Sequence, residues 1–262
     1  MPYDDSTVFI GKDLCFGYGS RPVLKNLTLR LSKGKVVALV GSNGAGKTTL
    51  MNLISGYLMP QSGQLQFQGI DYAGWSAPHI ARMGVARSFQ DMRLCSELNA
   101  IDHLLLAHHK VRGECLPFAW LHSYWKAEND AHTEDALTTL NALGISSQTA
   151  RQPLKELSYG QLRMVGFACA IGNAPKLILL DEPTSGVAEA ESEKIVERLL
   201  TLRRAGATLL VIEHNLEIIR KIADETVLLE DGRVLIQGPT EDVLDSAEFK
   251  STMFGESYDG NS

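Results

Sequence analysis

The segment Gly41-Ser-Asn-Gly-Ala-Gly-Lys-Thr48 restricts the possible folds of this chain more than any other part of its sequence. It follows the uninterrupted apolar run Val36 to Val40, which is typical of a strand covered on both faces in a parallel sheet. Its glycines allow a sharp turn and bring backbone N–H groups close to phosphate oxygens. The helix expected over 47–55 points its N-terminus at the same anion. The segment therefore predicts an α/β fold with a phosphate-binding loop between a strand and a helix.

Two side chains of this loop have predicted roles of their own. Lys47 is expected to neutralise the β- and γ-phosphates, and the Thr48 hydroxyl is expected to bind Mg²⁺. A glycine turn that precedes Lys-Thr by accident is the alternative, and the strand before and the helix after argue against it. No NKxD motif is present to select guanine, so we expect ATP as the nucleotide. The expected nucleotide-binding residues of the loop are Gly41, Ser42, Asn43, Gly44, Ala45, Gly46, Lys47, Thr48 and Thr49.

A pair of carboxylates ends a second buried strand. The apolar run Leu177 to Leu180 leads to Asp181 and Glu182, which places both at the carboxyl edge of the sheet, where ligands bind in open α/β folds. Asp181 suits the coordination shell of Mg²⁺, and Glu182 suits a base that orients an attacking water. An acidic pair after a strand is usually a solvated strand end, but beside a phosphate-binding loop the functional interpretation is favoured.

Composition limits the function classes. The chain has 262 residues, 44% of them hydrophobic and 21% charged, as in ordinary globular proteins with one large domain or two small ones. Its net charge of -6 argues against a nucleic-acid partner. No apolar run approaches the roughly 20 residues of a membrane span, and the N-terminus lacks a signal-peptide core. We therefore expect a cytoplasmic protein. The four cysteines have no metal-binding or disulfide spacing, and they are Cys15, Cys95, Cys115 and Cys169.

Hydrophobic periodicity predicts three regions. Residues 8–40 have the pattern of strands with tight turns, 65–69 alternate as a second antiparallel piece near the first, and 99–172 has helical spacing. Beyond these, strands at 177–180 and 208–212 alternate with helices at 191–204 and 216–223, which implies a parallel sheet. A hairpin is expected to turn at Asp231-Gly232. The expected fold is a P-loop NTPase core with a mostly parallel sheet, an N-terminal antiparallel β subdomain and an inserted all-helical subdomain.

The segment Leu157-Ser-Tyr-Gly-Gln161 lies between the phosphate-binding loop and the acidic strand end. Ser158 is a good helix N-cap, and Gly160 permits close approach of a phosphate. With this order of motifs, the chain resembles the ATP-binding subunit of ABC transporters over 8–255, with a helical subdomain at about 93–172 and a tail at 256–262. The resemblance implies an ATPase that works as a dimer, in which Ser158, Gly160 and Gln161 close over ATP held by the other subunit.

The resemblance assigns three further residues. Tyr18 matches the aromatic residue that stacks on adenine, Gln90 matches the glutamine that contacts Mg²⁺ and the attacking water, and His214 matches the switch histidine. The expected catalytic residues are thus Glu182, His214 and Gln90, and the expected metal-binding residues are Thr48, Gln90 and Asp181. The chain departs from the family at two positions, Ala188 in place of Asp or Asn and Cys169 in place of Arg.

The segment 84–94 looks like the subgroup that imports branched-chain amino acids, urea or short amides. This resemblance implies a second ATPase subunit, identical or related, and two membrane permeases. It also implies a solute-binding protein outside the cell, acting indirectly, and a place at the cytoplasmic face of the plasma membrane. An ABC-type ATPase that acts on DNA or ribosomes is one alternative, although it would carry coiled-coil or zinc insertions or two such domains. A small P-loop kinase is another, but it would not need the segment 157–161.

Overall fold

The computed structural model describes residues 6–88, 94–107, 122–172 and 174–255, the side chains of 122–129 excepted. The chain divides into two compact units. The first unit comprises Met1–Arg87, Lys176–Glu182 and Leu199–Ser262, and the second unit comprises Ser88–Pro175 and Pro183–Arg198. No helix among the described residues is long and apolar enough to cross a membrane.

The first unit begins with an antiparallel sheet of four strands in the order β2-β1-β4-β5. In β2, Leu27, Leu29 and Leu31 are buried while Thr28 and Arg30 are less so, which confirms the predicted alternation. This one-sided burial is the usual pattern of an antiparallel sheet that covers a core. The strands are β1 (Thr7–Tyr18), β2 (Arg21–Ser32), β4 (Ser62–Phe67) and β5 (Ile70–Asp71).

A second sheet of six strands lies in the same unit in the order β10-β9-β3-β8-β7-β6. All neighbouring pairs are parallel except the edge hairpin of β9 and β10. This arrangement confirms the expected mostly parallel sheet. The strands are β3 (Val36–Val40), β6 (Val85–Arg87), β7 (Leu177–Asp181), β8 (Thr208–Ile212), β9 (Glu225–Glu230) and β10 (Arg233–Pro239).

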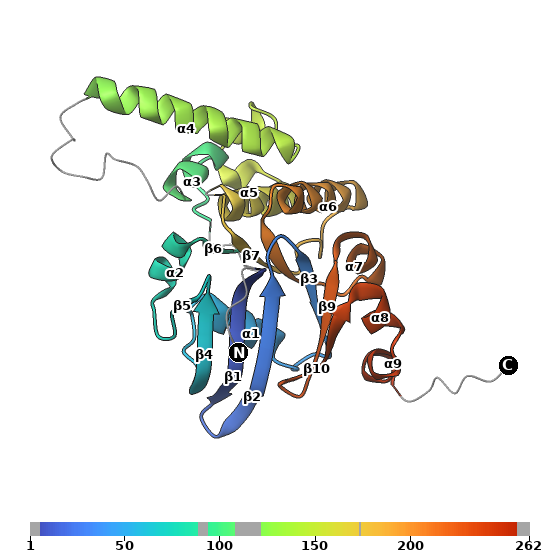
Figure 1. Ribbon diagram of the computed structural model, residues 1–262. Helices are drawn as coiled ribbons and strands as arrows, with labels where there is room; N and C mark the ends of the chain where they lie inside the picture. The colour runs from blue at the N-terminus through green and yellow to red at the C-terminus, as the bar shows by residue number, and fades with distance from the viewer. Residues whose placement is uncertain (1–5, 89–93, 108–121, 173, 256–262) are drawn as a thin grey trace. The chain divides into compact units, whose positions relative to one another are not determined.

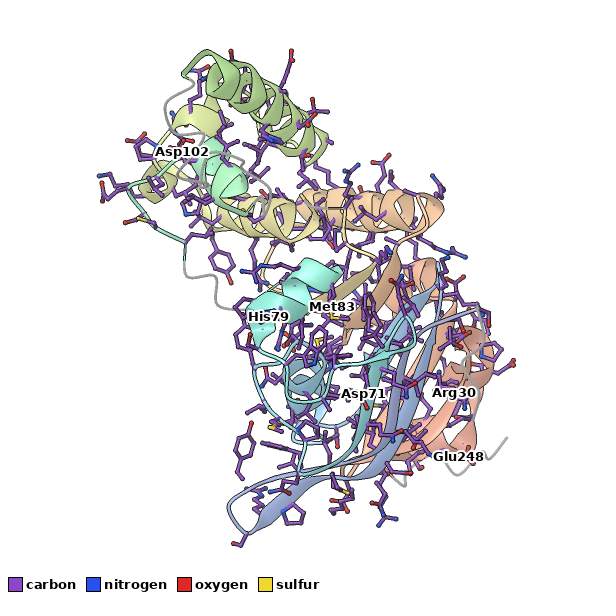
Figure 2. The ribbon with its side chains drawn as sticks, turned by 60° about the vertical axis from the view of Figure 1, so that its left-hand side comes forward. Arg30, Asp71, His79, Met83, Asp102 and Glu248 are labelled. Carbon is purple, nitrogen blue, oxygen red and sulfur yellow. The ribbon has the colours of Figure 1, made fainter. Side chains whose placement is uncertain are left out.

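Helices cover both faces of this sheet (Figure 1). Successive side chains of β3 point to opposite faces, so Val37 and Leu39 pack with α1 and the antiparallel sheet, while Ala38 and Val40 pack with α7, α8 and α9. Met83, labelled on α2 in Figure 2, packs against the cluster that contains Val37, Leu39 and the residues of α1. The helices are α1 (Lys47–Ile54), α2 (Ala77–Met83), α7 (Leu216–Ile222), α8 (Thr240–Asp245) and α9 (Ala247–Phe254).

The described part of the second unit is helical, as the periodicity of 99–172 predicts. Its helices α3, α4 and α5 contact one another, and α3 begins with Asp102 in its first turn (Figure 2). They are α3 (Ala100–Ala107), α4 (His122–Ala142) and α5 (Tyr159–Ile171), with 3₁₀ turns at Thr149–Arg151 and Leu154–Glu156. Helix α6 (Glu189–Arg204) begins in the second unit and ends in the first.

Some predicted boundaries were wrong, and some elements were missed. Helix α6 begins at Glu189 rather than at residue 191, because its first turn is acidic and exposed and carries no apolar periodicity. Strand β6, which has only three residues, was not predicted, and neither were the helices α2, α8 and α9. Helices of six to eight residues provide too few turns for a hydrophobic stripe to stand out.

Candidate functional site

The predicted phosphate-binding loop lies between β3 and α1, as the sequence indicates. A Cβ atom at Gly41 would lie 2.0 Å from the Leu229 carbonyl oxygen, so a side chain cannot fit there. Gly46 is the N-cap of α1 with φ of 105°, a left-handed conformation that favours glycine. The N–H of Gly232, in the β9–β10 turn, donates to the Ala45 carbonyl over 3.1 Å. These contacts fix the loop against the sheet.

The polar groups of the loop differ in exposure. Lys47 is only 7% exposed, and its Nζ donates to the carbonyls of Gly41 at 2.7 Å and Ser42 at 3.0 Å. Burial lowers the pKa of Lys47, while the nearby carboxylates of Glu182 and Asp181 oppose that shift. Thr48 is exposed and Thr49 is buried. The loop thus carries a buried positive charge on Lys47 and an exposed hydroxyl on Thr48.

Asp181 ends β7 as a buried carboxylate beside a buried cation. Its Oδ2 lies 3.6 Å from a terminal nitrogen of Arg87, at the end of β6, and both side chains are about 5% exposed. The other terminal nitrogen of Arg87 donates to Oδ1 of Asn52 on α1 at 2.5 Å and to Oγ of Ser55, the C-cap of α1, at 3.2 Å. Burial raises the pKa of Asp181, and Arg87 opposes that shift. No role was predicted for Arg87, although an arginine at the end of a short, otherwise apolar strand is an unusual choice.

Glu182 and His214 meet at the carboxyl edge of the sheet. His214 Nε2 lies 3.1 Å from Glu182 Oε1, and the Glu182 N–H donates to the Ile212 carbonyl at 3.0 Å. Glu182 has φ of 48°, a conformation that non-glycine residues seldom adopt and that is often found at functional sites. The structure thus brings together two residues that are 32 positions apart in the chain.

Glu213 is a second carboxylate at this edge, and the sequence analysis assigned it no role. It is 4% exposed, and its Oε2 accepts a hydrogen bond from the His214 N–H at 3.1 Å. Burial, with a smaller contribution from the charge of Glu182, raises the pKa of Glu213 to about 7. A carboxylic acid directly after the apolar strand β8 is the signal that could have identified it.

Tyr18 ends β1 with its side chain accessible. The residue is 54% exposed, and its ring packs edge-on against Phe16 with centroids 5.0 Å apart. One ring therefore supports another while most of the tyrosine is open to solvent. This exposure agrees better with the predicted stacking of Tyr18 on a base than with the alternative, a half-buried structural tyrosine.

The segment 157–161 forms the start of α5 in the second unit. Ser158 is the N-cap, its Oγ accepts from the Gln161 N–H, and the Gln161 side chain accepts from the Ser158 N–H, so the two residues form a capping box. A Cβ atom at Gly160 would lie 2.0 Å from a carboxylate oxygen of Glu191 on α6. A side chain at Gly160 would therefore have to displace the carboxylate end of the flexible Glu191 side chain.

Ala188 and Cys169, where the chain departs from the family, lie in α6 and α5 or at their ends. Ala188 is exposed, and its carbonyl accepts from the N–H groups of Glu191 and Ser192, so it stands at the N-cap of α6. Burial raises the pKa of the Cys169 thiol to about 12, which keeps it protonated and unreactive. Gln90, predicted to be both a catalytic and a metal-binding residue, lies outside the described residues, as does Cys115.

The donor set fits a metal ion that arrives with a nucleotide. Among the described residues, no group of three or more His, Cys, Asp or Glu side chains could hold a metal ion. Mg²⁺ is commonly bound by one or two carboxylates together with substrate phosphates and waters, rather than by an all-protein cage. One carboxylate, Asp181, and one exposed hydroxyl, Thr48, in the same unit as the phosphate-binding loop match that requirement.

Comparison with known proteins identifies the family. The model of the family described as ABC transporter matches residues 24–185, which is more than half of the chain. The chain belongs to the ABC transporter family. The ATPase expected from the sequence is thereby confirmed, as are its P-loop NTPase fold and the resemblance from which both were inferred.

Individual members of the ABC transporter family are similar along almost the whole chain. The high-affinity branched-chain amino acid transport ATP-binding protein LivG of Salmonella typhimurium is 30% identical over 246 residues, which are 93% of this chain and 96% of LivG. The corresponding protein BraF of Pseudomonas aeruginosa is 29% identical over 245 residues, with the same shares of both chains. These relatives agree with the branched-chain subgroup expected from residues 84–94.

Solved structures of the family have the same fold. A nucleotide-free ATP-binding cassette from an ABC transporter matches with a TM-score of 0.81 and 26% identity, over 95% of this chain and all of that chain. The ADP conformation of an ATP-binding cassette of an ABC transporter matches with a TM-score of 0.79 and 27% identity, over 95% of this chain and 99% of that chain. The chain is thus an ATP-binding subunit of the ABC transporter type.

Proposed function

We propose that the chain is the ATP-hydrolysing subunit of an importer that energises uptake of a small polar solute. The names of LivG and BraF favour branched-chain amino acids over urea or short amides as that solute. The main support for catalysis is the pairing of Glu182 with His214 at the same sheet edge as Asp181, in the unit that carries the phosphate-binding loop. In this proposal, residues 8–255 are one ATP-binding domain with a helical subdomain at about 93–172.

Nucleotide binding is assigned to the residues of the loop and to Tyr18. The adenine ring stacks on the exposed Tyr18, and the N–H groups of the loop and of the first turn of α1 face the phosphates. Lys47 exchanges its hydrogen bonds to the loop carbonyls for phosphate oxygens, which is favourable because the buried amine gains anionic partners. Mg²⁺, when bound, neutralises phosphate charge, and Thr48, Gln90 and Asp181 would hold it.

Glu182 is the proposed base in hydrolysis. Its carboxylate accepts a proton from water while the water oxygen forms a bond to the γ-phosphorus and the bond to the bridging oxygen breaks, which leaves ADP and phosphate. His214 keeps this carboxylate in position through the contact at 3.1 Å. Ser158, Gly160 and Gln161 of a second subunit, identical or related, cover the γ-phosphate, so that hydrolysis requires two copies of this fold.

Transport follows from the association of the two subunits. ATP favours the closed dimer because it contacts both subunits there, and hydrolysis removes that preference. Opening and closing are passed to two membrane permeases that dock near Gln90 at the cytoplasmic face of the membrane. A solute-binding protein delivers the solute from the other side. No nucleic acid takes part in this cycle.

Two substitutions in the complete transporter test the proposal. Lys47→Ala should abolish hydrolysis, whereas Glu182→Gln should keep ATP binding and accumulate the closed, ATP-bound dimer. Lys35→Ala is the matched control, since Lys35 pairs with Glu225 on the same unit and lies outside the loop. Unchanged ATP turnover in Glu182→Gln would remove Glu182 as the base.

Two further measurements distinguish the alternative classes of protein. Copurification with two polytopic membrane proteins separates a transporter from an ATPase that acts on DNA or ribosomes. Release of ADP without a phosphorylated acceptor separates it from a kinase.

A further inference from the structure

Arg87 is a buried cation that contacts a predicted metal ligand. Its guanidinium donates to Asn52 on α1 and to Ser55, the C-cap of α1, and lies 3.6 Å from the Asp181 carboxylate. Asn52 and Ser55 offer neutral oxygens, so of these three partners only Asp181 carries a charge that balances the guanidinium. The Asp181 carboxylate in turn is buried, and a buried carboxylate is unfavourable without a cation close to it.

The position of Arg87 in the chain gives this contact further weight. Arg87 is the last residue of β6 and the last residue of the first unit before the chain continues into the second. Its bonds to α1 connect the strand end with the helix that follows the phosphate-binding loop. Arg87 therefore joins three parts of the first unit that surround the predicted ligand of the metal ion: β6, β7 and α1.

We propose that Arg87 is a positioning residue that neutralises Asp181 while no metal ion is present and competes with Mg²⁺ for that carboxylate. This inference rests on the proposed function, because it takes Asp181 as a residue that holds Mg²⁺. A second cation near one carboxylate is repelled by the first, and at the effective dielectric constant of a protein two charges several ångströms apart still interact appreciably. Loss of the guanidinium should therefore lower the stability of the folded chain without metal. It should also increase the extent to which Mg²⁺ strengthens nucleotide binding.

The test compares nucleotide affinity with and without metal. A fluorescent ADP analogue is titrated into the full chain in EDTA and again in Mg²⁺. The dissociation constant in EDTA divided by the dissociation constant in Mg²⁺ is the ratio that measures how much the metal ion strengthens nucleotide binding. Arg87→Met should raise this ratio by at least about threefold over the unsubstituted chain. It should also lower the melting temperature in EDTA. Arg87→Gln, which keeps an amide donor for Asn52, carries the same expectations if Arg87→Met does not fold.

Two controls separate the possible outcomes. Arg203→Met removes another arginine of the first unit, one that pairs with Asp224, and should leave the ratio unchanged. In an Asp181→Asn background the ratio should fall, and Arg87→Met should no longer raise it. A ratio in Arg87→Met or Arg87→Gln that equals or falls below that of the unsubstituted chain overturns the competition between Arg87 and Mg²⁺. A ratio that Asp181→Asn leaves unchanged instead overturns the assignment of Asp181 in the proposed function.

Discussion

The buried carboxyl group of Glu213 should make the stability of this chain depend on pH in a defined direction. Burial raises its pKa from the ordinary 4.5 to about 7 in the folded chain. Between these two values the unfolded chain has lost the proton while the folded chain still holds it. Since the folded state then binds more protons, the free energy of unfolding falls as pH rises.

The size of the effect follows from the shift. A shift of one pKa unit corresponds to about 1.4 kcal/mol, so this group should remove about 3 kcal/mol of stability between pH 4.5 and pH 7. Glu213→Gln carries no titrating group and keeps an oxygen that can accept from the His214 N–H. The variant should therefore gain about 3 kcal/mol relative to the unsubstituted chain over the same pH range.

Urea unfolding followed by circular dichroism at several pH values between 4.5 and 8 measures this difference. Glu193→Gln is the control, because Glu193 is exposed on α6 and should leave the pH profile unchanged. If the stability curves of the unsubstituted chain and Glu213→Gln run parallel across this range, Glu213 does not hold its proton in the folded chain. The account of its burial is then wrong.

Two further predictions concern backbone geometry. Gly41→Ala should cost more than about 3 kcal/mol of unfolding free energy, because its Cβ would lie 2.0 Å from the Leu229 carbonyl oxygen. Gly34→Ala is the control: Gly34 has φ of 72° and no atom within 4 Å of the added Cβ, so it should cost only about 1 kcal/mol. Equal losses of the two variants in urea unfolding would contradict this prediction. Ala188→Asn should raise the free energy of unfolding by about 1 kcal/mol, because the new side chain can cap α6. Ala190→Asn, inside the first turn, should not raise it. A melting temperature that Ala188→Asn leaves unchanged would exclude the cap.

The sequence predicts the sheet well because its strands are strongly patterned. The buried run 36–40 has apolar residues at every position, the run 208–212 has them at every position after Thr208, and both are central strands of the parallel sheet. The short strand β6 could not be found in this way, since three residues form no period and one of them is Arg87. Its place at the edge of the sheet depends on pairing with β7, about 90 residues further along the chain.

The site was predicted where a motif fixes the spacing and missed where only the fold brings residues together. The phosphate-binding loop is continuous in sequence, so its residue types alone indicate its chemistry. Arg87 and Glu213 follow no motif, and each becomes informative only because strand order places it beside Asp181 or Glu182. Gly160 is an intermediate case, because the motif predicts the glycine but not its contact with Glu191.

The charges of the first unit give a physical reason why one copy of the chain should not complete the proposed reaction. Among the residues that the structure describes, the buried cations at the site are Lys47 and Arg87, and the carboxylic acids there are Asp181, Glu182 and Glu213. With Glu213 protonated the cations and carboxylates balance, so these side chains leave no surplus positive charge for a triphosphate. The remaining stabilisation must come from backbone N–H groups, from Mg²⁺ and from a further helix N-terminus. Helix α5 has that property in its capped first turn, and in the proposed dimer a second subunit supplies it.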